Sequence, residues 1–137
     1  MMRLLLDRFD VTLAGMLIDA ETGANVATTS IAYRPPARIK NFVRFRDGTC
    51  RFPGCGVAAR RCDLDHVVPW SSGVGIGSAG RTEPNNLICL CRRHHRIKTL
   101  SRWTPVLDPV SAEVTWTDPY GQDWRTAPVD HREQAVA

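Results

Sequence analysis

Alternating apolar and polar positions mark the first part of the chain. Residues 10–33 are rich in Val, Ile and Thr, and a turn-forming segment over residues 19–23 divides them into two runs. A period of two between apolar residues is typical of strands with one buried face. The pattern therefore predicts a β-hairpin, and we treat residues 1–34 as a hairpin and linker that precede the main domain.

A helical period replaces the alternation after two consecutive prolines, Pro35 and Pro36. Proline interrupts a strand and suits the first turn of a helix. Apolar residues then lie largely on one side of a helix over about residues 36–46, basic residues occupy the other side, and Asp47-Gly48 ends it. The apolar side comprises Ile39, Phe42, Val43 and Phe45.

Short elements fill the rest of the chain. Residues 50–55 predict a tight knuckle, and residues 61–68 predict a short strand. Residues 71–80 hold four glycines and three serines, which indicates a flexible loop. A helix is expected over about residues 87–99. Three short strands are then expected at about residues 103–107, 112–117 and 123–126.

These elements predict an α+β fold with a modest core. The chain has 137 residues, of which 43% are hydrophobic, and this is enough for one domain. We assign residues 35–128 to that domain, with the three late strands as a C-terminal β extension. Residues 129–137 are expected to form a disordered tail.

Basic residues concentrate in the middle of the chain, although the net charge is only +4. Eight basic residues and one acid lie within residues 34–62, and five basic residues without an acid lie within residues 92–102. Six acids and two arginines follow. A basic middle favours a surface that faces a polyanion such as nucleic acid. A solvated helix face with scattered arginines explains the same charges.

Five cysteines and the absence of a secretory signal favour a reducing cytoplasm. The run Leu4–Leu6 is interrupted at once by charged residues, so it is too short for a signal core or a membrane span. In such a compartment, cysteines near histidines are more typical of metal ligands than of disulfides.

Two short-range pairs have the spacing of zinc ligands. Cys50 and Cys55 can hold a metal from the knuckle, and Cys91 and His94 can complete a tetrahedron from the start of a helix. The alternative is that these cysteines are buried as small apolar residues. Of the remaining two, Cys62 is expected in the core, with an exchange into the ligand set as the alternative. Cys89 is expected to point away from the metal.

A second cluster offers hydrolytic chemistry. On the short predicted strand, Asp65 and His66 would point to opposite faces unless the strand ends there, and Val67-Val68-Pro69 indicates that it ends soon. Asp65 could then bind a hard divalent cation while His66 faces a water molecule. His95 directly follows the zinc ligand His94 and projects about 100° away on a helix, which makes it the natural second ligand. A neutral imidazole can deprotonate an attacking water, because its pKa lies near the working pH. A metal site without any reaction is the alternative.

The combination resembles an HNH endonuclease. Asp65-His66, Asn86-Leu87 and residues 91–98 are similar to the HNH motif. Residues 50–55 followed by residues 62–66 look like the HNH cassette at the C-terminus of actinobacterial repeat-family proteins. The resemblance extends over about residues 30–128.

This resemblance implies a ββα-metal (His-Me finger) core with a structural zinc knuckle. It implies that His66 is the general base, and that Asp65 and His95 bind a catalytic Mg²⁺ or Mn²⁺. Asn86, the middle residue of the motif, would brace the loop that presents the base or contact the metal. The implied activity is metal-dependent cleavage of DNA that leaves 5′-phosphate and 3′-hydroxyl ends. The residues that match the family's zinc ligands are Cys50, Cys55, Cys91 and His94.

Two departures from the family pattern keep other functions open. Residues 71–81 form a longer and more glycine-rich loop than the resemblance leads us to expect. The long helical domain that usually precedes the cassette is not seen, which favours a fragment or a decayed copy. The alternatives are a non-catalytic, zinc-stabilised nucleic-acid-binding module and a structural zinc domain that serves a protein partner.

Overall fold

The computed structural model describes residues 33–70 and 80–131. The predicted hairpin over residues 10–33 therefore lies outside the described residues, except for Tyr33. The predicted loop over residues 71–80 lies outside them except for Gly80, and so do residues 132–137 of the predicted tail.

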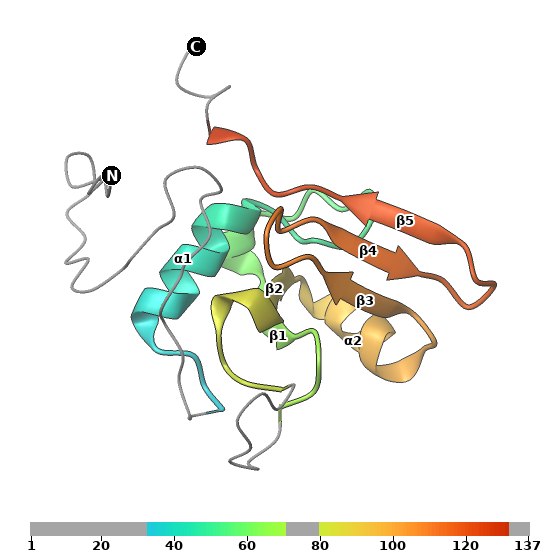
Figure 1. Cartoon of the computed structure of the whole chain (residues 1–137), viewed down its shortest axis with the longest axis horizontal. Helices are drawn as coiled ribbons and strands as arrows, with labels where there is room; N and C mark the ends of the chain where they lie inside the picture. Colours follow the sequence, from blue (N-terminus) through green and yellow to red (C-terminus); the bar gives the residue numbers. More distant parts are fainter. Residues whose placement is uncertain (1–32, 71–79, 132–137) are drawn as a thin grey trace.

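Two helices and two small antiparallel sheets make up the described part of the chain (Figure 1), which confirms the predicted α+β fold. The first helix and the first sheet precede the second helix, and the second sheet follows it. The elements are α1 (Ala37–Asp47), β1 (Asp63–His66), β2 (Leu87–Leu90), α2 (Arg92–Leu100), β3 (Thr104–Leu107), β4 (Val114–Thr117) and β5 (Asp123–Thr126). Single 3₁₀ turns at Ala59–Arg61 and Pro84–Asn86 lead into β1 and β2.

Helix α1 begins and ends within one residue of the predicted bounds. Ile39, Phe42 and Val43 of the predicted apolar side are buried, whereas Phe45 is 54% exposed. Ile39 and Val43 are fully buried against the hairpin of β1 and β2. Gly48 ends the helix with a φ of 65°, and its N–H donates to the carbonyl of Arg44. A side chain here would be strained by that φ, and its Cβ would also lie 2.1 Å from Val129 Cγ2. The glycine therefore ends the helix and lets residue 129 pack against it.

Strand β2 corrects the sequence prediction of a helix over residues 87–99. Residues 87–90 pair with β1 in register, with Asp65 opposite Ile88, and α2 begins only at Arg92. All four residues of β2 are buried, because α1, α2 and β1 pack around this strand. A strand buried on both faces is a continuous apolar run, and its periodicity does not distinguish it from a buried helix.

A buried ion pair connects α1 to both sheets. The carboxylate of Asp47 accepts hydrogen bonds from Arg51 at 2.8 Å and from the backbone N–H of Cys89 at 2.8 Å. The other guanidinium nitrogen of Arg51 donates to the carbonyls of Ala112 and Thr126. Because Asp47 and Arg51 are each 1% exposed, this pair fixes the end of α1, the knuckle and the C-terminal strands to one another.

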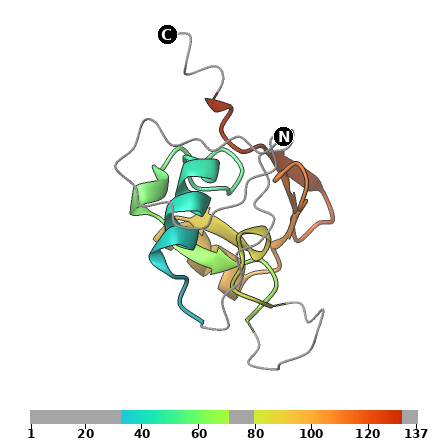
Figure 2. The same ribbon diagram turned by 60° about the vertical axis from the view of Figure 1, so that its left-hand side comes forward.

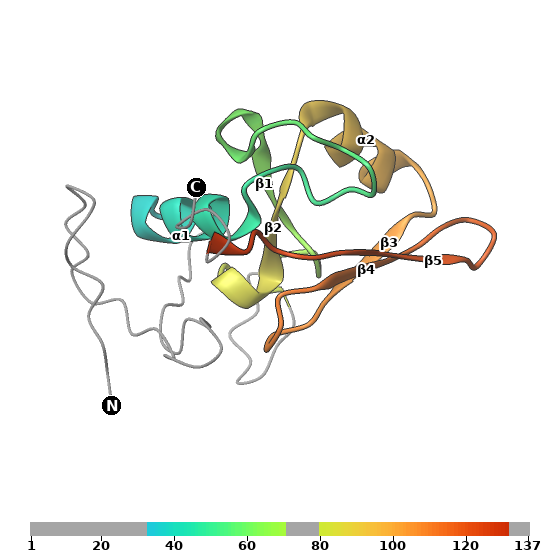
Figure 3. The ribbon, with the colours of Figure 1, turned by 90° about the horizontal axis from the view of Figure 1, so that it is seen from above.

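The three late strands lie where they were predicted, and they form an antiparallel sheet in the order β3–β4–β5. This sheet lies on the far side of the β1–β2 hairpin from α1 (Figure 2). Seen from above, it forms a separate layer beside α2 (Figure 3). Trp116 of β4 is fully buried, and its indole N–H donates to the carbonyl of Arg51 at 2.8 Å. The sheet thus covers the knuckle that carries the metal ligands.

Part of the segment predicted as a disordered tail lies against α1. The N–H of Val129 donates to the carbonyl of Arg46, and the ring of His131 stacks on Phe45 with centroids 3.8 Å apart. Within the described residues, no helix is long and apolar enough to cross a membrane.

Candidate functional site

Four side chains converge in the arrangement expected of a closed metal site. The ligand atoms of Cys50, Cys55, Cys91 and His94 all lie within 4.8 Å of one another. His94 Nδ1 is 3.5 Å from Cys50 Sγ and 3.3 Å from Cys91 Sγ. A tetrahedral zinc ion sets about 3.6 Å between sulfur and nitrogen ligands, so these edges fit one. The cluster predicted from spacing can therefore hold a metal ion such as zinc.

The surroundings of this cluster hold the imidazole and one thiol in place. Phe52 stacks on the ring of His94 with centroids 4.1 Å apart, and the N–H of Cys91 donates to Cys50 Sγ. Burial, with a smaller effect of the Cys55 thiol, raises the pKa of Cys50 to about 12. Burial lowers the pKa of His94, which favours the neutral ring that binds metals. Burial thus opposes ionisation of the Cys50 thiol, and a bound cation would offset that cost.

The other two cysteines stay outside the cluster, as the sequence led us to expect. Cys62 Sγ contacts the carbonyl of Ala58 at 3.5 Å, in the core beneath the 3₁₀ turn. Cys89 is fully buried on strand β2, and not on a helix as predicted. Burial raises the pKa of both thiols, which makes them inert.

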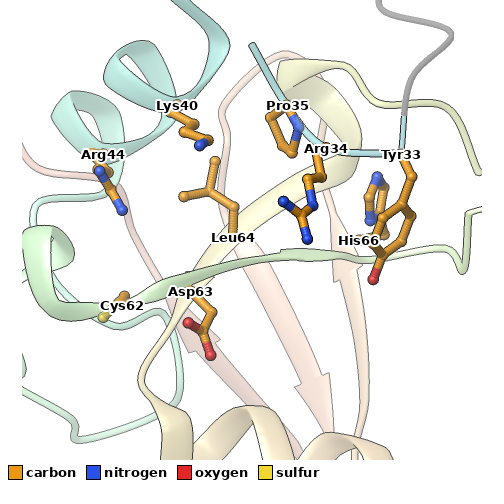
Figure 4. Close-up of a pocket in the computed structure, with 9 residues that line it drawn as sticks. All are labelled: Tyr33, Arg34, Pro35, Lys40, Arg44, Cys62, Asp63, Leu64 and His66. Carbon is orange, nitrogen blue, oxygen red and sulfur yellow. The ribbon is translucent and has the colours of Figure 1, made fainter. Parts of the chain in front are cut away.

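Strand β1 sends alternate side chains to opposite faces. Asp63 and Asp65 face helix α2, whereas Leu64 and His66 face α1 and the segment before it (Figure 4). The strand is extended through His66, so Asp65 and His66 do not point the same way. The two halves of the predicted hydrolytic pair consequently have different neighbours.

On the α2 face, His95 lies between two carboxylates. Its Nε2 is 3.1 Å from Asp65 Oδ1, and its Nδ1 is 3.3 Å from Asp63 Oδ2. An imidazole that coordinates a metal usually donates its other N–H to a carboxylate, which fixes the ring. Asp63 is placed for that orienting role, and it leaves Nε2 directed at Asp65. The predicted pair of ligands for a divalent ion is thus brought together.

Lys98 contacts the carboxylate oxygen of Asp65 that does not face His95. Its ammonium group contacts Asp65 Oδ2 and donates to the carbonyl of His66 at 2.6 Å. The Asp65 side chain is only 11% exposed, so this charge matters more than one at the open surface. One oxygen of Asp65 therefore faces Lys98 and the other faces His95.

On the opposite face, the ring of His66 is oriented by Thr82. Its Nε2 lies 2.9 Å from Thr82 Oγ1, and the same hydroxyl lies 3.3 Å from the carbonyl of Tyr33. The single hydroxyl proton can be donated to either of these two acceptors, so the contact orients the ring and leaves both tautomers open. Burial lowers the pKa of His66 against the opposing charge of Asp65. The ring is therefore a neutral base.

Asn86 braces the backbone at Val68 and Arg81, which lie on either side of residues 71–79 in the sequence. Its Oδ1 accepts the N–H of Val68 at 2.9 Å, and its Nδ2 donates to the carbonyls of Val68 and Arg81. Its side chain is buried, and these three bonds use most of its hydrogen-bonding capacity. Of the two roles that the resemblance implied for Asn86, the geometry favours bracing over contact with a metal.

Sequence reasoning missed three neighbours of these residues. Asp63 has the same strand face as Asp65 because it is two positions away, and Lys98 lies one helical turn after His95. Both signals are visible in the sequence once β1 and α2 are placed. Thr82 gave no such signal, because only the fold brings it to His66.

Comparison with known proteins agrees with the resemblance. Residues 48–100 match the family model described as HNH endonuclease. Two proteins of Mycobacterium tuberculosis are similar over 97 residues, or 70% of this chain: uncharacterized protein Rv2100, 47% identical, and uncharacterized protein Rv3776, 44% identical. The match spans only 16% and 17% of the lengths of those two relatives. No solved structure matches the chain.

Proposed function

Because residues 48–100 carry an HNH endonuclease domain, we propose that the chain is a metal-dependent endonuclease that hydrolyses DNA phosphodiester bonds. The observation that carries the proposal is the approach of Asp65 Oδ1 to His95 Nε2, at 3.1 Å across β1 and α2. A carboxylate oxygen and a neutral imidazole nitrogen are ligands that suit divalent first-row ions, and a carboxylate also suits Mg²⁺. The family match supports this class of reaction, and the Asp65–His95 contact supports this location for the divalent ion.

Each residue near this pair has a task that follows from its contacts. Asp65 and His95 would hold Mg²⁺ or Mn²⁺, and such an ion offsets phosphate charge and stabilises the leaving oxygen. Asp63 would keep Nε2 of His95 available as a ligand. His66 would accept the proton of the attacking water at Nδ1, in the tautomer that donates Nε2–H to Thr82. The base and the ion would act from the two faces of β1.

The cluster of Cys50, Cys55, Cys91 and His94 would hold a structural zinc ion. Its four ligands leave no open position for a substrate, which is the mark of a structural site. It joins the knuckle to the start of α2, and therefore fixes the helix that presents His95. Zinc binding would contribute part of the folding free energy of this small domain.

A plasmid-nicking assay with Mg²⁺ or Mn²⁺ tests the proposed activity. Replacement of His66 by Ala should lower the nicking rate by about 10²- to 10⁴-fold, the usual contribution of a general base. His131→Ala is the matched control, because among the described residues that histidine contacts Phe45, near the C-terminal end of α1. Nicking by His66→Ala at the rate of the unchanged chain would refute the assigned mechanism. Ligation of the products would test for 5′-phosphate ends.

One observation favours a second candidate, a zinc-stabilised module that binds nucleic acid without cutting it. The ring of His66 lies on the face of β1 away from Asp65, and Lys98 already neutralises part of the Asp65 charge. Such a module should bind DNA with strong salt dependence and should leave plasmid intact under every divalent ion tested. Nicking that depends on His95 would exclude it.

A further inference from the structure

A cavity of about 260 Å³ lies on the His66 side of β1, beneath helix α1. We call it the α1–β1 pocket. Its walls come from the segment before α1, from α1 itself and from β1 (Figure 4). The residues that line it are Tyr33, Arg34, Pro35, Lys40, Arg44, Cys62, Asp63, Leu64 and His66.

Three cationic side chains face this pocket without a partner. Figure 4 shows the charged ends of Arg34, Lys40 and Arg44 directed toward the space around Leu64. Among the described residues, none of the three forms a side-chain ion pair or hydrogen bond, and Arg44 Nε is buried without an acceptor. A buried donor of a charged group without an acceptor is costly, so it marks a place where an acceptor belongs.

The one acid in the pocket wall does not neutralise these cations. Asp63 lies on the other face of β1 in Figure 4, where it contacts His95 at 3.3 Å and Arg92 at 3.5 Å. The pocket therefore combines three positive charges with the uncharged ring of His66 and the aromatic ring of Tyr33, which stack with centroids 5.4 Å apart. An anion with several acceptor oxygens is the ligand that fits this set.

We propose that the α1–β1 pocket binds a backbone phosphate of a nucleic-acid strand that passes beside the Asp65–His95 pair. The pocket reaches the proposed site in two ways: His66 forms part of its wall, and Asp63 joins its floor to His95. Among the described strands, β1 pairs only with β2, and a nucleic-acid strand would cross from one face to the other at the edge of β1 that no described strand pairs with. The inference rests on the nucleic-acid substrate proposed above, but not on cleavage.

Helix α1 and the residues before it would then bind the substrate, although they lie outside residues 48–100, which match the HNH family. Arg34, Lys40 and Arg44 all precede residue 48, where the match to the HNH family begins. Arginine can grip a phosphate through two parallel hydrogen bonds, and lysine adds a point charge. These contacts would position the strand and increase affinity without reading its sequence.

The first test compares two triple variants in DNA binding, each measured in a His95→Ala background so that cleavage plays no part. Arg34→Gln, Lys40→Gln and Arg44→Gln together remove the pocket charges. Arg38→Gln, Arg60→Gln and Arg102→Gln together remove the same charge from exposed positions that do not line the pocket. Fluorescence anisotropy with a labelled duplex across 50–200 mM salt gives the affinity and its salt slope.

The pocket variant should bind on the order of 100-fold more weakly at about 0.1 M salt, with a slope of log affinity against log salt that is reduced by about 2 to 3. The control should lose much less of both. Equal losses of affinity in the two triple variants would overturn the proposal that the pocket binds phosphate. Absence of DNA binding by the chain without the triple changes would overturn it as well. The double variant Arg34→Gln and Lys40→Gln alters only exposed side chains, so it answers the same question if the change at Arg44 disturbs folding.

The second test uses the Nε–H signal of Arg44 in ¹H–¹⁵N NMR spectra. A short oligonucleotide should shift this signal, because its phosphate supplies the missing acceptor, while inorganic phosphate at the same ionic strength should shift it much less. A response to inorganic phosphate alone would mean that the pocket binds free phosphate and not a nucleic-acid strand, which would overturn the proposal. If the signal responds to the oligonucleotide but no ion supports nicking, the pocket proposal stands and the proposed catalysis fails. If nicking occurs without a response of the signal, the proposed catalysis stands and the pocket proposal fails.

Discussion

Helix α2 contributes one histidine to each of two groups of side chains, and the two groups differ in how many ligands they offer and how exposed they are. His94 joins three cysteines in a set of four ligands at its N-terminal end, whereas the next residue, His95, meets Asp65 with 33% of its side chain exposed. Adjacent residues on a helix project about 100° apart, which is enough to assign them to different ions. A metal held by the closed cluster would have no position left for a substrate, whereas an ion held by the proposed Asp65–His95 pair would have several. One helix thus presents a ligand of the candidate structural site and the histidine of the proposed catalytic pair.

The largest effect is expected when the closed cluster loses a ligand. Replacement of Cys91 by Ser should release the metal and unfold the domain, because structural zinc contributes roughly 10–16 kcal/mol of apparent binding free energy in small zinc domains. Metal content by mass spectrometry and circular dichroism measure both outcomes. Cys62→Ala is the matched control, since Cys62 is equally buried but lies outside the cluster. A folded, metal-loaded Cys91→Ser variant would contradict the assignment.

The next largest effect is expected at the buried ion pair of Asp47 and Arg51, which stabilises the fold without contacting a metal. Replacement of Asp47 by Ala should cost about 3–5 kcal/mol of unfolding free energy, because it leaves the buried Arg51 guanidinium without its carboxylate. Urea denaturation of the zinc-loaded chain gives this value. Asp123→Ala on the exposed strand β5 provides a control for loss of an acid. An equal, small change in both variants would mean that Asp47 does not hold α1 to the two sheets.

A change at the open pair should affect activity and not stability. Replacement of His95 by Ala should leave zinc content and the melting temperature close to those of the unchanged chain. Nicking should fall by more than the roughly 10- to 100-fold typical of an outer hydrogen-bond partner, because a ligand itself is lost. The assay is nicking across Mn²⁺ concentrations, with zinc content measured in parallel. If His95→Ala and Cys91→Ser melt alike, the division of ligands between two ions is wrong.

The smallest effect concerns the carboxylate behind His95. Replacement of Asp63 by Ala should weaken the binding of the proposed catalytic ion by about 10- to 100-fold and leave the maximal nicking rate at saturating Mn²⁺ largely intact. The reason is that Asp63 orients the ring without holding the ion. Asp63→Asn keeps an oxygen acceptor and should restore most of the affinity. A fall in the maximal rate with unchanged metal dependence would place Asp63 in a different role.

Local spacing made much of the fold and of the closed cluster predictable from the sequence. The helix over α1 and the strands β3, β4 and β5 follow from periodicity and turn residues over short windows. The four zinc-type ligands follow from two pairs that each lie within one knuckle or one helical turn. Helix α2 was placed too early, because the apolar run of β2 looks the same in a buried strand and in a buried helix.

The sequence by itself determined which residue types lie near one another along the chain, and hence the ligand set and the HNH motif. Only the tertiary structure decided which way they face. Asp65 and His66 are neighbours in sequence, but the extended backbone of β1 sends one to His95 and the other to Thr82. Thr82 comes from 16 positions away, and Arg34, Lys40 and Arg44 converge on the α1–β1 pocket only because α1 packs over the hairpin. Side-chain direction and long-range packing depend on the whole chain, so a local pattern could not supply them.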